Sequence, residues 1–187
     1  MKFAPFQPLQ TPRLVLRKFS MEDAPDFFEK LASSEKVTEF MLWEPHRALV
    51  DSQNSIRKVL QRYDSQEPYT WAIALKESGD LIGRIDLLRF DAQTDSCSFA
   101  YMLGADFWNL GYGTEAVKAV FCFAFSELEV SAIEADHMAE NPASGAVMRK
   151  AGMKYLGVMP RKYEKKGVWH DAVSYRITQE EWSYHEN

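Results

Sequence analysis

A stretch of apolar residues in the second half of the chain constrains its fold more than any other feature. Residues 111–127 predict a helix whose apolar side chains, such as Val117 and Phe121, are spread over almost its whole circumference. A helix of this kind is normally buried on most of its sides. Predicted strands lie on both sides of it, at 96–103 and 132–138. The segment therefore predicts a parallel, right-handed strand–helix–strand crossover inside a sheet.

The other predicted elements place antiparallel strands around this crossover. Alternating apolar residues predict a first strand at 13–19, and Ser20 followed by Asp23 predicts the start of a helix that continues to residue 33. The expected order continues with a helix at 51–63, strands at 69–75 and 81–90, a helix from 141 to 152, a hairpin of 153–163 and 168–177, and a short final turn at 178–181. We expect a single α/β (α+β) domain of residues 1–187. Its sheet should be mixed but mostly antiparallel, with about seven strands and flanking helices.

Charge and cysteine content narrow the class of protein. The 187 residues carry 22 Lys and Arg against 27 Asp and Glu, which gives a net charge of −5. Non-specific binding to nucleic acids or anionic membranes requires clustered positive charge, so neither is an expected partner. Cys97 and Cys122 form neither a disulfide framework nor a zinc-binding spacing. The sequence has no signal-peptide pattern or membrane-spanning stretch, and we expect a cytoplasmic protein without a metal.

Two glycines at the start of the buried helix form the sharpest motif. Gly111 and Gly113 follow the strand that ends at Leu103, where free N–H groups and the helix dipole attract an anion such as a pyrophosphate. The spacing Gly111-x-Gly113-x-x-Ala116 also fits a dinucleotide fingerprint, although seven residues separate Leu103 from the first glycine. A third interpretation is a glycine-rich helix entry with no ligand. A mononucleotide P-loop is excluded because no Gly-Lys-Ser/Thr follows.

The surrounding residues resemble the GCN5-related N-acetyltransferase (GNAT) superfamily. The segment Trp108-Asn109-Leu110-Gly111-Tyr112-Gly113-Thr114-Glu115-Ala116 is similar to its acyl-CoA pyrophosphate loop, in the form found in ribosomal-protein N-terminal acetyltransferases. The other landmarks of that branch are present in order: Leu9–Arg17, Asn141-Pro142-Ala143-Ser144, Lys150-Ala151-Gly152-Met153, Asp171 and Tyr175. The resemblance extends from Leu9 to about Ile177.

This resemblance implies a binding site for acetyl-CoA as cosubstrate. In the superfamily, the strands equivalent to 96–103 and 132–138 splay apart, and the pantetheine arm lies between them like an added strand. The implied contacts for pantetheine are Met102, Leu103 and Asn141, with Ser144 beside Asn141. Lys150 or Arg149 is implied for a CoA phosphate. The pyrophosphate would bind the backbone N–H groups of Leu110, Gly111, Tyr112, Gly113 and Thr114.

For the catalytic step, the resemblance points to a serine and an acidic residue. Ser144 matches the proposed proton donor of the ribosomal-protein branch, although a serine in the first turn of a helix also serves as a cap. Met148 occupies the position of a tyrosine in many other members. Glu164 lies near the branch's acidic residue and is the expected base. Weaker candidates on the strand beside the gap are Glu134, Asp136 and His137, which are more often polar groups on a sheet surface.

The expected reaction is transfer of an acetyl group from acetyl-CoA to a primary amine by direct attack. Trp43, Glu44 and His46, in a predicted loop, are candidates for binding the acceptor amine. The resemblance favours a protein or peptide N-terminal amine, such as that of a ribosomal protein, and a monomer or homodimer. The open alternatives are a small-molecule amine (polyamine, amino acid or aminoglycoside), an acyl-CoA-binding sensor without turnover and a nicotinamide-dependent oxidoreductase.

Overall fold

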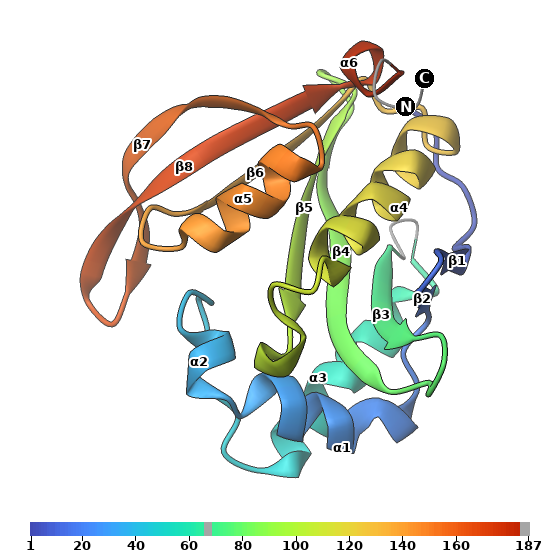
Figure 1. Cartoon of the computed structure of the whole chain (residues 1–187), viewed down its shortest axis with the longest axis vertical. Helices are drawn as coiled ribbons and strands as arrows, with labels where there is room; N and C mark the ends of the chain where they lie inside the picture. The colour runs from blue at the N-terminus through green and yellow to red at the C-terminus, as the bar shows by residue number, and fades with distance from the viewer. Residues whose placement is uncertain (66–68, 184–187) are drawn as a thin grey trace.

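One sheet of eight strands organises the part of the chain that the structure describes, residues 1–65 and 69–183. In this computed structural model the strand order is β1-β2-β3-β4-β5-β6-β8-β7 (Figure 1). The strands are β1 (Leu9–Gln10), β2 (Leu14–Arg17), β3 (Thr70–Leu75), β4 (Leu81–Asp91), β5 (Ser96–Leu103), β6 (Ala132–Met138), β7 (Lys154–Lys165) and β8 (Val168–Thr178). Neighbouring strands are antiparallel, except that β5 and β6 are parallel. The predicted mixed sheet with one parallel crossover is therefore confirmed.

Helices cover both faces of this sheet. They are η1 (Met21–Asp23), α1 (Ala24–Asp26), η2 (Phe27–Ala32), α2 (Glu35–Thr38), α3 (Leu49–Arg62), η3 (Ala105–Phe107), α4 (Tyr112–Ser126), α5 (Pro142–Lys150) and α6 (Gln179–Ser183). α4 and α5 lie over one face (Figure 1), whereas α1, η2 and α3 pack on the other. Successive strand residues serve the two layers in turn, since Trp71 and Ile73 pack with α4 while Ala72 packs with η2 and α3. Within the described ranges, no helix is long and apolar enough to cross a membrane.

The predicted elements are confirmed in type, and their bounds differ by a few residues. The helix expected at 20–33 is formed by η1, α1 and η2 without a break, and the Ser20 backbone N–H donates to the Asp23 carboxylate at 2.8 Å. The helices expected at 51–63 and 141–152 are α3 and α5. β1 and α2 were not expected. They have two and four residues, which are too few to show a periodic pattern of apolar residues in the sequence.

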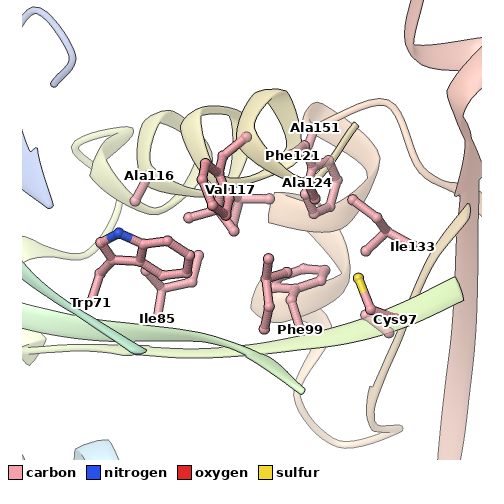
Figure 2. Close-up of a cluster of buried hydrophobic side chains, with 14 of the residues drawn as sticks. Trp71, Ile85, Cys97, Phe99, Ala116, Val117, Phe121, Ala124, Ile133 and Ala151 are labelled. Carbon is pink, nitrogen blue, oxygen red and sulfur yellow. The ribbon is translucent and has the colours of Figure 1, made fainter. Parts of the chain in front are cut away.

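α4 carries the centre of the hydrophobic core. The side chains of Val117, Phe121 and Ala124 have no exposed surface. Figure 2 shows them packed against residues of the sheet, among them Ile85 and Phe99. The rings of Phe121 and Phe99 meet edge to face, with centroids 5.1 Å apart. Burial on nearly every side explains why this helix is apolar around almost its whole circumference.

Replacing Phe121 with alanine should lower the free energy of unfolding by about 3–5 kcal/mol, because the cavity adds to the lost burial. Urea unfolding followed by circular dichroism measures this change. Lys118→Ala, at an exposed position of the same helix, should change it by less than about 0.5 kcal/mol. Equal stability of the two variants would contradict the central place of α4 in the core.

Candidate active site

The sheet opens between its two parallel strands. In the described residues, pairing of β5 with β6 covers only Ser96–Ser98 and Ala132–Glu134, although both strands continue for several residues. β5 stays paired with β4 as far as Leu103, and β6 with β8 as far as Met138. Each strand is thus held by its outer neighbour, and the inner edges diverge. The gap predicted for the pantetheine arm is present as a feature of the backbone.

Successive residues of β5 direct their peptide groups alternately toward β4 and toward this gap. Gly104 donates its backbone N–H to the Ile82 carbonyl in β4 at 2.9 Å. Hydrogen-bonded pairs alternate along an antiparallel ladder, so Met102, two residues earlier, also bonds to β4. The peptide groups of Tyr101 and Leu103 face the gap. Of the two residues expected to pair with pantetheine, Leu103 is therefore in position, and Met102 turns its peptide groups to the neighbouring strand instead.

The loop before α4 lies close to the end of β5. The Trp108 indole N–H donates to the Leu103 carbonyl at 2.8 Å, which ties the loop to the strand. Gly111 precedes α4 with a φ of 85°, a conformation that glycine adopts without strain. A Cβ atom at Gly113 would lie 3.3 Å from the Leu103 side chain and 3.5 Å from the Tyr101 ring. Glycine at this position lets the start of α4 approach the gap closely.

This helix start has the properties of an anion site. The first-turn N–H groups of an α-helix have no acceptors within the helix, and the dipole places positive potential at the same end. α4 is 15 residues long, and its loop residues Leu110 and Gly111 are exposed. The residues expected to hold the pyrophosphate, 110–114, are therefore together at the edge of the gap.

The N-terminal segment clamps this loop in place. Glu115, in the first turn of α4, accepts hydrogen bonds from the Thr11 hydroxyl at 2.6 Å and from the Arg13 backbone N–H at 2.9 Å. The Arg13 guanidinium forms an ion pair with the same carboxylate at 2.6 Å and donates to the Leu110 carbonyl at 2.9 Å. It also lies over the Tyr112 ring, 4.4 Å from the centroid. One arginine thus contacts the loop and the first turn together.

Burial of Glu115 disfavours its charged form, but the hydrogen bonds from Thr11 and Arg13 outweigh burial, and the pKa of Glu115 is lowered. A carboxylate with a lowered pKa in the folded state adds stability above its ordinary pKa. That stability is lost as the pH falls through the lowered value. The clamp is therefore fully formed at neutral pH.

α5 brings Ser144 to the other side of the gap. The Asn141 side chain caps α5 by accepting a hydrogen bond from the Ser144 N–H at 3.3 Å. The Ser144 hydroxyl interacts with the phenol of Tyr101 on β5: burial raises the pKa of Tyr101, and this hydrogen bond opposes the rise. Met148 is buried in the core. Ser144 therefore reaches the gap, whereas the side chain at position 148 belongs to the packing.

α5 also packs against the start of α4. Val147 lies 3.6 Å from the position of a Cβ on Gly113. Lys150 is exposed at the end of α5, nearly one turn beyond Val147, and stays a candidate for a CoA phosphate. Arg149 has a structural partner instead, because it donates to the Tyr175 hydroxyl at 2.8 Å.

A cavity of about 670 Å³ lies on the opposite face of the sheet, against η2 and α3. All three residues predicted to bind the acceptor, Trp43, Glu44 and His46, line it. Tyr101 and Met102 of β5 form part of the same lining. The structure therefore brings the predicted acceptor residues together beside the gap.

The tip of the β7–β8 hairpin closes one side of this region. Lys166 forms an ion pair with Glu44 at 3.2 Å. Lys165 donates to the carbonyls of Thr38, the last residue of α2, and of Glu39 after it, at 2.9 and 2.7 Å. The hairpin tip thus contacts both the acceptor loop and the end of α2.

A second cavity, of about 710 Å³, shares Ala100 with the first. Asp136 of β6 lines it, and its carboxylate accepts hydrogen bonds from Lys162 and Tyr163. Glu164, the expected base, is exposed and pairs across the hairpin with Trp169. Successive residues of a strand point to opposite faces, so the register places Tyr163 at the cavity and turns Glu164 away.

Comparison with known families agrees with this geometry. The model of the family described as "Acetyltransferase (GNAT) domain" matches residues 13–154, a range that includes the gap and both helices beside it. The chain belongs to the GNAT acetyltransferase family. The oxidoreductase alternative is thereby removed, and the protein is an N-acetyltransferase by family.

Individual relatives match this GNAT domain over nearly their whole length. "Uncharacterized N-acetyltransferase p20" of Bacillus licheniformis is 27% identical over 176 residues, which cover 94% of this chain and 98% of the relative. A GNAT-family acetyltransferase structure from Bacillus anthracis has a TM-score of 0.83 at 23% identity, covering 93% of this chain and 99% of its own. RimL, a ribosomal L7/L12 alpha-N-protein acetyltransferase solved with coenzyme A, has a TM-score of 0.79 at 15% identity, covering 92% and 98%. At these identities the two structures establish the fold.

Sequence reasoning did not find two parts of this GNAT site. Tyr101 was missed because the strand pattern shows that alternate residues share an edge but not which set faces the gap. The partnership of Thr11 and Arg13 with Glu115 was missed because their contacts span more than 100 positions of sequence. The acidic Glu115 in the first turn of the helix was the available signal.

Replacing Arg13 with alanine should weaken acetyl-CoA binding about tenfold, or about 1.4 kcal/mol, because the loop before α4 loses its clamp. Isothermal titration calorimetry with acetyl-CoA measures this change. Arg57→Ala, at an exposed arginine of α3 that bonds Asn54, should bind like the wild type. Equal affinity of the Arg13 and Arg57 variants would show that the clamp has no part in binding.

Proposed function

We propose that this protein transfers the acetyl group of acetyl-CoA to the free N-terminal amine of a peptide or protein, such as a ribosomal protein. The observation that carries the proposal is the gap between β5 and β6. On one face it is bordered by the α4 loop and α5, and on the other by the acceptor cavity. Tyr101 borders both, because its phenol interacts with Ser144 and it lines the acceptor cavity. Two substrates bound on the two faces would meet at this strand.

The residues beside the gap fit acetyl-CoA. The N–H groups at the start of α4 suit a pyrophosphate, and Gly113 lets them approach the gap, because a Cβ there would lie 3.3 Å from the Leu103 side chain. The peptide groups of Tyr101 and the N–H of Leu103 are directed to the gap, where they suit the amides of pantetheine, while the Leu103 carbonyl accepts the Trp108 indole N–H. Bound there, acetyl-CoA supplies an activated acetyl group. A cytoplasmic location, where such cosubstrates are made, is part of the proposal.

The chain supplies three elements of the transfer. A backbone N–H facing the gap from β5 is positioned to stabilise negative charge that develops on the carbonyl oxygen. Ser144 donates a proton to the departing thiolate, and its hydroxyl lies near the phenol of Tyr101. A base near the acceptor cavity must keep the amine neutral, since a protonated amine cannot attack.

Two observations support a peptide as acceptor. The two cavities on the acceptor face, of about 710 and 670 Å³, adjoin at Ala100, and together they offer more room than a small amine requires. The wall contributed by β7 includes Leu156 and Val158, whose side chains are 60% and 50% exposed and suit an apolar segment of a substrate. RimL, with the same fold, is named for a ribosomal alpha-N-protein substrate.

The purified protein should release CoA thiol from acetyl-CoA with short peptides that begin with serine or alanine. The same peptides with a blocked N-terminus are the matched controls and should give none. Spermidine, free lysine and kanamycin test the small-amine alternative in parallel. Turnover with one of these three and none with any peptide would overturn the peptide assignment. Acetyl-CoA binding without turnover on any amine would favour the sensor.

Replacing Ser144 with alanine should lower kcat while acetyl-CoA affinity stays unchanged. The expected loss is modest, about ten- to a hundredfold, because a thiol with a pKa of about 8.5 gives a thiolate that is already a good leaving group. Steady-state kinetics of thiol release and calorimetry measure the two quantities. Ala143→Ser, at the preceding exposed position, is the control and should keep wild-type kcat. Wild-type kcat in the Ser144 variant would remove Ser144 from catalysis.

A further inference from the structure

His46 is held in the wall of the acceptor cavity by contacts on three sides. Its backbone N–H donates to the Ala32 carbonyl at 2.9 Å. Its ring packs against those of Trp43 and Phe27, with centroid distances of 5.2 and 6.1 Å. The side chain is half-buried and lines the same cavity as Tyr101. An imidazole fixed in this way has little freedom to rotate.

One ring nitrogen of His46 is already engaged. Its Nδ1 lies 2.8 Å from the hydroxyl oxygen of Ser52, a fully buried residue of α3. When Nδ1 carries the proton and donates it to Ser52, the lone pair of a neutral imidazole is on Nε2. In this tautomer Nε2 is the acceptor, and the cavity that the ring lines is also lined by Tyr101 of β5.

Charged and titratable groups surround His46, and four of them form two ion pairs. They come from its own loop (Glu44), from α2 and the residue after it (Glu35 and Glu39), from α3 (Asp51 and Lys58), from β4 (Arg84 and Asp86), from β5 (Tyr101) and from the hairpin tip (Lys165 and Lys166). Arg84 pairs with Asp86 at 2.8 Å, and Lys166 with Glu44 at 3.2 Å. Burial lowers the pKa of His46 from its ordinary value, and the charge of Asp51 opposes this only in part.

The acidic candidates are less suited to accept a proton. Both carboxylate oxygens of Asp136 are engaged, one by Lys162 and the other by Tyr163. Asp86 is held by both Arg84 and the Thr70 hydroxyl. Glu164 is exposed on the hairpin. Of the groups considered for the base, His46 combines a place in the acceptor cavity with a ring nitrogen, Nε2, for which the described residues show no hydrogen bond.

We propose that His46 is the catalytic base, which takes a proton from the acceptor amine, and that Ser52 is the positioning residue that holds its ring. This inference rests on the proposed function. The neutral form of the acceptor amine bonds to the acetyl carbon as the carbon–sulfur bond breaks, and the nitrogen gives the proton that it must lose to Nε2 of His46. The departing thiolate takes up one proton through Ser144, so one proton leaves the nitrogen and one reaches the sulfur. His46 then returns its proton to solvent.

The test uses the peptide or amine that the wild type acetylates fastest in the thiol-release panel. His46→Gln should lower kcat about a hundredfold, within the usual range for a general base, and leave acetyl-CoA affinity unchanged. In the wild type, kcat/KM corrected to free amine should fall on the acid side as His46 becomes protonated, below an ordinary imidazole pKa of about 6.5. This acid limb should be absent from His46→Gln.

Two further variants separate chemistry from structure. His170→Gln, at a histidine of β8 that pairs with Glu140, is the matched control and should keep both the rate and the acid limb. His46→Ala should regain activity when imidazole is added, which a purely structural role would not produce. Ser52→Ala should lower kcat and leave acetyl-CoA affinity unchanged.

The outcomes distinguish this inference from the proposed function. If the wild type transfers acetyl to an amine and His46→Gln keeps the same kcat and acid limb, His46 is not the base and the proposed function stands. If the wild type transfers acetyl to no amine of the panel, the proposed function fails and the role of His46 fails with it. Loss of acetyl-CoA binding in His46→Gln would also overturn the assignment, because the residue would then act through structure.

Discussion

The early end of the hydrogen bonding between β5 and β6 is the constraint on which the rest of the site depends. Peptide groups that are not paired in a sheet carry a free-energy cost unless another partner satisfies them. Here the long ladders of β5 with β4 and of β6 with β8 keep the strands from closing. The inner edges are thus held open as a rigid template. A ligand with amide groups of its own can complete the sheet without moving the fold.

The anion site is held by contacts from the opposite end of the chain. Thr11 and Arg13 lie beside β2, at one end of the sheet order, yet they fix Glu115 at the start of α4. This arrangement couples the docking of the N-terminal segment to the shape of the cosubstrate loop. Glycine at 113 allows the close approach of α4 to β5, and the buried apolar faces of α4 keep the helix there.

In the proposed mechanism, the two faces of the sheet divide the work of the reaction. The face covered by α4 and α5 provides main-chain donors, a helix dipole and Ser144. The face covered by α1, η2 and α3 provides an aromatic and titratable wall that contains Trp43 and His46. Tyr101 connects them, because its ring touches the start of α4 while it also lines the acceptor cavity. A proton donor and a proton acceptor on opposite faces can each be tuned by a separate environment.

The sequence by itself determined the element types, the crossover and the glycine loop, because these follow from local periodicity and from helix-end chemistry. It also placed Ser144 in the site through resemblance, and it offered Trp43, Glu44 and His46 as acceptor residues from the side chains of a predicted loop. Only the tertiary structure decided which residues of β5 hydrogen-bond to β4. As a result, the peptide groups of Tyr101 and Leu103 face the gap, and those of Met102 do not. The tertiary structure likewise decided that Tyr163, not Glu164, faces the cavity. Because a strand repeats every two residues, either of two sets of alternate residues can face a given side. Only pairing with a neighbouring strand selects one set.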